Sequence, residues 1–317
     1  MTHASARERF DRIRAGLRLP AVVAPMFLVS GPDMVVAAAR AGVLGSFPAP
    51  NARTIDVFEQ WVATISEQLA GFRRDGVAGA TDAWAMNLVV HRTYERLEQE
   101  LAILEKYRPP IVITALGSPR DVVETMHGWG GLVIADVNSV EYARKAAAVG
   151  VDGLALVSAG AGGHTGNMAG FAFVPAVREF FDGILILAGA IGDGRAVRAA
   201  EVLGADLSYM GTRFITAAES IAAEEYKQMV VDSVFPDLVL TDFFTGAHAY
   251  YMRQSIEAAG LDPDNLEAGT GMNLSEKKAW KDVWSAGQGV GTIHEVEPLA
   301  DIVDAIAREY EAAKRVP

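Results

Sequence analysis

The chain has no cysteine, and this absence removes several kinds of chemistry. Without cysteine among its 317 residues, it can form no disulfide, iron–sulfur cluster, thiolate nucleophile or sulfur-ligated zinc site. No spacing among its six histidines suggests another metal site. We therefore expect no metal centre, and any redox chemistry must come from a bound organic cofactor.

Positive charge and long apolar runs are also scarce. The 28 Lys and Arg residues are outnumbered by 40 Asp and Glu residues, giving a formal net charge of −12. A nucleic acid or an anionic membrane would need a basic face, so a small molecule is the expected partner. No apolar run approaches the roughly 18 residues of a membrane span, and residues 1–14 lack the apolar core of a signal peptide. We expect a cytoplasmic protein.

Short apolar runs alternate repeatedly with amphipathic stretches along the chain. Charged residues line one side of these stretches and Ala, Val and Leu the other, as in helices that cover a parallel sheet. Eight runs favour an α/β fold of the (β/α)₈ TIM barrel type, with an open Rossmann-type sheet as the alternative. The predicted strands are 21–24, 43–46, 83–86, 110–115, 131–135, 153–157, 184–188 and 205–210.

The strand rhythm stops after Phe214. Residues 218–288 are predicted to form a helical insertion that caps the barrel mouth, rich in aromatics such as Tyr250, Tyr251, Trp280 and Trp284. We divide the chain into a barrel (1–217), this cap (218–288) and a C-terminal segment that returns to the barrel (289–317). The aromatics could alternatively serve a subunit interface in a homo-oligomer.

Several chemically distinctive residues are expected just past the C-terminal ends of the predicted strands, the face that carries active sites in this fold. These residues are Pro25, Met26, Asn87, Asp136, the loop 158–170, Gly189, Ala190, Gly211 and Thr212.

Two glycine-containing segments, after the seventh and eighth strands, predict a phosphate site. Gly189 and Ala190 can bring backbone N–H groups close to an anion that the following helix dipole also favours. Gly211 and Thr212 repeat the arrangement. The alternative is that these glycines only form tight turns. Their paired occurrence at these two strands favours a cofactor that bears a phosphate.

His164 lies in a loop with almost no other side chains, Ser158–Gly166. The glycines allow a planar ligand to approach the backbone, and His164 is the only group of the loop that titrates near neutral pH. The alternative is a structural histidine. Asn87 either binds the cofactor or caps the following helix. Asp136 is equally ambiguous, because a carboxylate beside an electron-rich ring is unfavourable unless it is solvated or hydrogen-bonded.

Six ordered motifs, spread over nearly the whole chain, resemble the nitronate monooxygenase family, formerly called 2-nitropropane dioxygenases. They are Ala24-Pro25-Met26, Met86-Asn87-Leu88, Ala161–Gly166, Ala188–Gly194, Met210–Phe214 and Ala286–Gly289.

The resemblance implies an FMN-dependent barrel in which His164 faces the substrate over the flavin. It implies oxidation of alkyl nitronates by O₂ to a carbonyl compound and nitrite, and of nitroalkanes if His164 acts as a base. With the strand-end positions, the resemblance indicates the cofactor-binding residues Ala24, Pro25, Met26, Asn87, Asp136, Gly162, Gly163, Gly189, Ala190, Gly211, Thr212 and Gln288.

Departures from the family pattern keep other functions open. Val157–Gly160 replaces a common Gln-Gly-x-Glu, Ala190 replaces a usual glycine, and Asp136 stands where some relatives have lysine. The alternative is an FMN-dependent NAD(P)H reductase of the same fold, acting on a quinone or an enoyl-acyl-carrier protein. A non-redox barrel or a silent binding protein would lack flavin absorbance.

Overall fold

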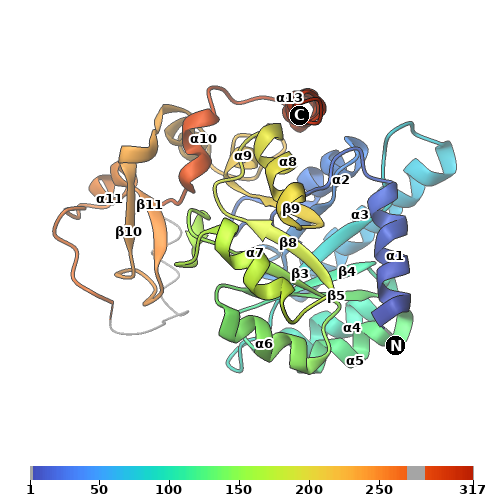
Figure 1. The fold of residues 1–317 in the computed structure, drawn as a ribbon. Coiled ribbons are helices and arrows are strands. Elements are labelled where there is room, and N and C mark those ends of the chain that lie inside the picture. Colours follow the sequence, from blue (N-terminus) through green and yellow to red (C-terminus); the bar gives the residue numbers. More distant parts are fainter. Residues whose placement is uncertain (1–2, 270–282, 317) are drawn as a thin grey trace.

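Eight parallel strands form a nearly closed barrel in the computed structural model, which describes residues 3–269 and 283–316 (Figure 1). Neighbouring strands follow the order β1-β9-β8-β6-β5-β4-β3-β2, and the pairing of Val22 with Leu44 joins β1 to β2. The predicted TIM barrel is confirmed. The strands are β1 (Ala21–Val23), β2 (Gly45–Pro48), β3 (Trp84–Val89), β4 (Ile111–Ala115), β5 (Leu132–Val137), β6 (Gly153–Val157), β8 (Ile184–Ala188) and β9 (Leu207–Met210).

Helices follow the strands and surround the barrel (Figure 1). Local signals define their ends: the Thr54 hydroxyl accepts the Val57 N–H at the start of α3, and Gly76 ends this helix in a left-handed conformation. The barrel helices are α2 (Pro32–Arg40), α3 (Ile55–Asp75), α4 (Leu97–Tyr107), α5 (Arg120–Trp129), α6 (Val140–Val149), α7 (Gly170–Arg178), α8 (Gly194–Leu203), α9 (Thr212–Ile215) and α13 (Leu299–Ala313). None of the described helices is long and apolar enough to cross a membrane.

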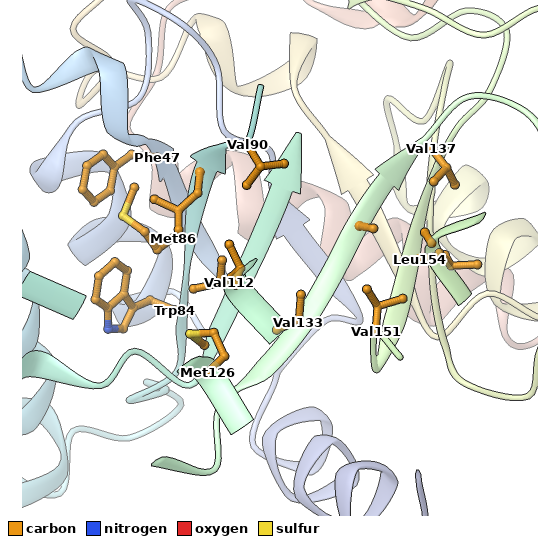
Figure 2. Packing of buried hydrophobic residues seen from close by; sticks show 14 of the residues in the cluster. Phe47, Trp84, Met86, Val90, Val112, Met126, Val133, Val137, Val151 and Leu154 are labelled. Atoms are coloured by element: carbon orange, nitrogen blue, oxygen red, sulfur yellow. The ribbon is translucent and has the colours of Figure 1, made fainter. Parts of the chain in front are cut away.

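Alternate residues of each strand face two separate apolar layers. The outward residues pack under the helices, as Figure 2 shows for Met86, Val112 and Val133. In this layer the rings of Phe47 and Trp84 stack at 6.2 Å between centroids. The inward residues fill the barrel itself with branched side chains, so the barrel is a packed core and not a pore.

An N-terminal helix, α1 (His3–Ala15), closes the barrel at the end opposite the mouth. Its Ala6 and Phe10 are buried among the inward-facing strand residues. In Figure 1, α1 and the elements of segment 218–288 lie on opposite sides of the barrel. Access to the barrel interior is therefore confined to the mouth.

The proposed cap contains strands as well as helices. Its described elements are α10 (Glu224–Asp232), η2 (Phe235–Asp237), β10 (Leu238–Thr241), β11 (Ala249–Met252) and α11 (Arg253–Ala258). β10 and β11 form an antiparallel hairpin, to which β7 (Gly163–His164) adds a third strand. The helical prediction for 218–288 is thus incomplete. Residues 270–282, with Trp280, lie outside the described residues.

Candidate active site

The carboxyl ends of the barrel strands meet at one edge, because all eight strands are parallel. The predicted residues Pro25, Gly189 and Gly211 follow β1, β8 and β9 at this edge. The prediction that Asn87 and Asp136 lie just past their strands is wrong, because each lies inside its strand, β3 or β5. Their side chains therefore belong to the wall of the barrel and not to its loops.

Asn87 contacts a neighbouring strand and does not cap a helix. Its Nδ2 donates to the carbonyl oxygen of Ile113 in β4 at 3.1 Å. The next helix, α4, has Arg96 at its N-cap position. Asn87 therefore does not cap a helix. Its contact with the cofactor stays a prediction.

Asp136 Oδ1 and Tyr209 Oη are buried without a hydrogen-bond partner among the described residues. Tyr209 belongs to the inward-facing cluster, and Asp136 lies two residues after Ile134 of the same cluster, so both side chains point inward. Burial raises the pKa of Asp136 to about 7, although the residue keeps partial contact with solvent. Burial, followed by the charge of Asp136, also raises the pKa of Tyr209. Because buried polar atoms are normally paired, these two neighbouring atoms at the barrel mouth are candidates for contact with a polar ligand.

Three glycine-rich segments meet backbone to backbone: the loop after β6, the loop after β8 and the segment Ala286–Gly289. The carbonyl oxygen of Gly160 accepts hydrogen bonds from Ala190 N at 3.3 Å and from Gln288 N at 2.9 Å. A Cβ on Gly162 would lie 2.7 Å from the nitrogen of Gly287, so only glycine fits there. Predicted residues far apart in the sequence are thus neighbours in space.

Some of the predicted phosphate donors are already engaged within the chain. The Ala190 N–H donates to the Gly160 carbonyl, and the Thr212 hydroxyl oxygen accepts from Gly287 N at 2.8 Å. The backbone N–H of Thr212 lies in the first turn of α9, where a helix offers no acceptor of its own. The backbone at Thr212 is therefore the better candidate for binding an anion.

The backbone at Gly189 and Ala190 is left-handed, with φ of 120° and 55°. A Cβ on Gly189 would lie 2.2 Å from Ser158 Oγ, so this position requires glycine. Ala190 adopts the conformation that a glycine would adopt more easily, at a cost of about 1–2 kcal/mol. The alanine changes the residue type but keeps a glycine-like backbone.

The N-terminus of α8 is occupied by carboxylates of the chain itself. Asp193 Oδ1 accepts from Ala196 N at 2.7 Å, and Glu309 Oε2 accepts from Gly194 N at 2.9 Å. These charges already complement the helix dipole. The N–H groups of Gly194 and Ala196 are therefore already engaged, and the contribution of this dipole to phosphate binding stays a prediction.

His164 is held by the insertion. In the β7–β11 pairing, His164 lies opposite Ala249, and Thr165 N donates to the His248 carbonyl at 3.0 Å. The ring nitrogen Nε2 lies 3.0 Å from Thr245 Oγ1. Burial lowers the pKa of His164, so the imidazole is neutral at pH 7. A neutral imidazole can serve as a general base.

Gln288 ties the C-terminal segment to the same small sheet. Its Nε2 donates to Tyr250 Oη at 2.7 Å, and Tyr250 lies opposite Gly163 in the β7–β11 pairing. Gly163 and Gln288 are both predicted to contact the cofactor. Gly163 precedes His164 in β7, and Gln288 bonds to Tyr250, the β11 residue opposite Gly163.

Asn51 is a residue of this edge that sequence reasoning misses. Its Oδ1 accepts from Leu28 N at 2.9 Å, and its Nδ2 donates to the carbonyls of Met26 at 2.9 Å and Ser30 at 2.7 Å. These bonds fix the loop after β1, in which Leu28 has a left-handed φ of 60°. Asn51 follows β2 at the same edge, so the strand-end rule itself would have identified it.

Thr245 is also missed, and it carries a weaker signal. It lies in the turn between β10 and β11 and is 3% exposed. The apolar alternation in residues 238–241 is too short to predict a strand before this turn. No local sequence pattern indicates that Thr245 contacts His164. Only the folded chain brings Thr245 to this histidine.

The described part of the chain also has two surface cavities. One of about 400 Å³ has walls from α9, η3 (Gln288–Thr292) and α13, and one of about 290 Å³ has walls from α3, β3 and α4. Neither is lined by a predicted site residue, so we place the site by its converging backbone and unpaired polar atoms. Within 3–269 and 283–316, no three His, Asp or Glu side chains are grouped to hold a metal ion.

Comparisons with known proteins agree with this geometry. A nitronate monooxygenase of Paraburkholderia phytofirmans is 25% identical, over 93% of each chain. A protein of Rhodococcus jostii, named (3aS,4S,5R,7aS)-5-hydroxy-7a-methyl-1-oxo-octahydro-1H-indene-4-carboxyl-CoA dehydrogenase, is 24% identical, over 95% of this chain and 94% of that one. The structure of a nitroalkane oxidase from Streptomyces ansochromogenes has a TM-score of 0.76 and 25% identity, covering 93% of this chain and 96% of that one.

The names of these relatives differ in substrate but all describe oxidoreductases. The family model for nitronate monooxygenase matches residues 14–309, from before the first barrel strand into the last helix. The protein is an oxidoreductase, and the chain belongs to the nitronate monooxygenase family.

Proposed function

We propose that the protein is an FMN-dependent enzyme that oxidises alkyl nitronates with O₂, releasing a carbonyl compound and nitrite. The observation that carries this proposal is the position of His164: a buried, neutral imidazole in a strand between the glycine-rich segments and the insertion. A small-molecule substrate, O₂ as its partner and a cytoplasmic location belong to the same proposal.

The residues at the barrel mouth fit a flavin mononucleotide. Asp136 Oδ1 and Tyr209 Oη need polar partners, and glycines without Cβ atoms leave the backbone open to close approach. In this proposal the backbone of Ala24–Met26, fixed by Asn51, would help to hold the ring system. Bound FMN would supply electron transfer between the substrate and oxygen.

The phosphate of the cofactor is assigned to the ends of β8 and β9. The backbone N–H groups of Gly211 and Thr212 are the main donors in this proposal, because Ala190 N already donates to Gly160 O. Gly189 allows close approach by its left-handed backbone. This assignment predicts that flavin retention depends on these segments and not on His164.

In this proposal the Asp136 carboxyl group is a hydrogen-bond donor that is protonated in only a fraction of the molecules at neutral pH. With a pKa raised to about 7 by burial, a large fraction of the carboxyl groups is protonated at pH 7. A protonated carboxyl can donate a hydrogen bond toward the ring system without adding negative charge beneath it. Asp136 could thus replace the lysine of some relatives as a hydrogen-bond donor, but not as a cation.

His164 acts on the substrate side of the site in this proposal. Toward a neutral nitroalkane, the neutral imidazole removes the α-proton and so produces the nitronate. Toward a preformed nitronate no base is needed, and His164 only lines the substrate site. The apolar side chains of the insertion exclude water around both substrates.

An NAD(P)H reductase is the second candidate. The segment Val157–Gly160 lacks the acidic residue common in the family, and Asp136 supplies no positive charge. A relative of similar identity is named a dehydrogenase of a CoA ester. The two electron donors, an alkyl nitronate and a reduced nicotinamide, must therefore be compared directly.

Anaerobic stopped-flow absorbance separates the two candidates. The purified holoenzyme is mixed with an alkyl nitronate, and separately with NADH and with NADPH. Rapid bleaching of the flavin by the nitronate alone, followed by nitrite release when O₂ is admitted, supports the proposal. Rapid bleaching by a nicotinamide together with no response to the nitronate contradicts it and identifies a reductase.

A further inference from the structure

The Thr245 hydroxyl connects the insertion to the imidazole of His164. Thr245 Oγ1 lies 3.0 Å from His164 Nε2 and 3.2 Å from the carbonyl oxygen of Ala247. Thr245 is 3% exposed, so water does not compete strongly for these contacts. The Tyr251 side chain is a third hydrogen-bond partner of Thr245. A hydroxyl has one proton to donate and can accept two hydrogen bonds, so the three contacts fit a hydroxyl that donates once and accepts twice.

The Ala247 carbonyl can only accept a hydrogen bond, so the Thr245 hydroxyl donates its proton there. The hydroxyl oxygen then accepts, and His164 Nε2 must carry the proton of the second contact. Because burial disfavours the imidazolium form, the ring is neutral and its lone pair is on Nδ1.

The same hairpin fixes the backbone on both sides of His164. His164 lies opposite Ala249 in the β7–β11 pairing, and the next residue, Thr165, donates to the His248 carbonyl. Residues 245–249 therefore contact both the backbone beside His164 and its ring nitrogen Nε2. The rest of the glycine-rich loop contributes no comparable side chain to this task.

We propose that Thr245 is a positioning residue that holds His164 as the Nε2–H tautomer and makes Nδ1 its basic nitrogen. The inference rests on the proposed function in one respect: the substrate class that needs this base is a neutral nitroalkane with an α C–H. That bond breaks, its electron pair forms the C=N bond of the nitronate as the negative charge moves to the nitro oxygens, and the proton passes to Nδ1. The imidazolium so formed keeps its Nε2–H···Oγ1 bond to Thr245.

The tautomer can be measured without any substrate. In holoenzyme with ¹⁵N-labelled histidine, two-bond ¹H–¹⁵N correlation spectra distinguish protonated from unprotonated ring nitrogens, and His164→Gln identifies the signals of His164. We expect protonated Nε2 and unprotonated Nδ1 in the wild type. We expect a mixture of tautomers in Thr245→Val, and the wild-type pattern in Thr245→Ser, which restores the hydroxyl. Protonated Nδ1 in the wild type would overturn the inference.

The kinetic consequence is measured with two substrates. Thr245→Val should lower kcat/KM for a neutral nitroalkane roughly 10–100-fold, within the range of general-base contributions, and change it less than about threefold for the preformed nitronate. Thr241→Val makes the same chemical change in the same hairpin, where Thr241 Oγ1 contacts Phe243 N instead of His164, and should leave both values unchanged.

The outcomes separate this inference from the proposed function. Equal losses on both substrates, or no loss on the nitroalkane, would overturn the role of Thr245. If the wild type turns over neither nitro compound but shows the Nε2–H tautomer that Thr245→Val disturbs, the nitronate assignment fails while the positioning role is supported.

Discussion

The barrel mouth and the insertion differ in whether their polar groups near the candidate site have hydrogen-bond partners within the chain. At the barrel mouth, Asp136 Oδ1 and Tyr209 Oη have no hydrogen-bond partner among the described residues. In the insertion, Thr245, the His248 carbonyl and the Tyr250 hydroxyl all bond to the loop of His164 or to Gln288. In the proposed site these two barrel atoms are open to a ligand, whereas the three named groups of the insertion fix the loop of His164 and Gln288. Two other described atoms of the insertion, Gln254 Oε1 and Ser285 Oγ, are also buried without a partner.

The largest expected effect comes from the group that the insertion holds. His164→Ala should lower turnover of a neutral nitroalkane roughly 10²–10⁴-fold, because a general base is lost. Flavin content should persist, because the proposed phosphate contacts come from the barrel. Steady-state kinetics normalised to flavin absorbance test both statements. Loss of flavin with unchanged turnover per remaining flavin would reverse the roles of the two regions.

Gly189→Ala tests the barrel side of the comparison. A Cβ would meet Ser158 Oγ at 2.2 Å, and φ is 120°, so we expect destabilisation of at least about 1–3 kcal/mol and weaker FMN binding. Urea unfolding and FMN fluorescence titration measure the two effects. Gly291→Ala is the matched control, because a Cβ there meets nothing within 4 Å. Equal FMN affinity in both variants would remove Gly189 from the phosphate site.

Asp136→Asn tests whether the unpaired carboxyl group lowers the folding stability of the flavin-free protein. Burial raises the Asp136 pKa from 3.8 to about 7, so between these values the folded protein binds more protons than the unfolded chain. Stability therefore falls as pH rises through this window. Asparagine does not titrate, so the Tm advantage of the variant should be larger at pH 8 than at pH 5. A gap that is independent of pH would show that Asp136 is not buried as described.

The smallest expected effect is at Ala190. Ala190→Gly relieves a left-handed alanine, worth about 1–2 kcal/mol, but gives the unfolded chain more freedom, worth about 0.4–1 kcal/mol. We expect a net gain of between zero and about 1.6 kcal/mol in the free energy of unfolding. Ala102→Gly, on the exposed face of α4, should instead lose about 1 kcal/mol. Losses of the same size in both variants would contradict the strain assigned to Ala190.

Much of the barrel follows from the sequence because its strands are short, apolar and buried on both faces. The predicted ranges for β6 and β8 coincide with Gly153–Val157 and Ile184–Ala188. The ends of β3 and β5 are misplaced because a polar residue inside an apolar run, Asn87 or Asp136, resembles a strand end. We predicted each strand to end at its first polar residue, and this rule fails where a polar side chain inside the strand faces the barrel interior.

The insertion could not be predicted in the same way. Its strand β11 pairs with β7, which has only two residues, Gly163 and His164, and no local pattern marks so short a strand. The contact between His164 and Thr245 spans 81 positions in the sequence. Tertiary pairing, and not local propensity, decides this part of the structure.

The β7–β11 pairing has a consequence for engineering and for evolution within the family. Exchanging the insertion for that of a homologue would remove the strand and the hydroxyl that contact His164, so we expect a foreign insertion to fail unless residues 158–166 are transplanted with it. Under the proposed function, substrate preference and proton transfer would then be inherited together.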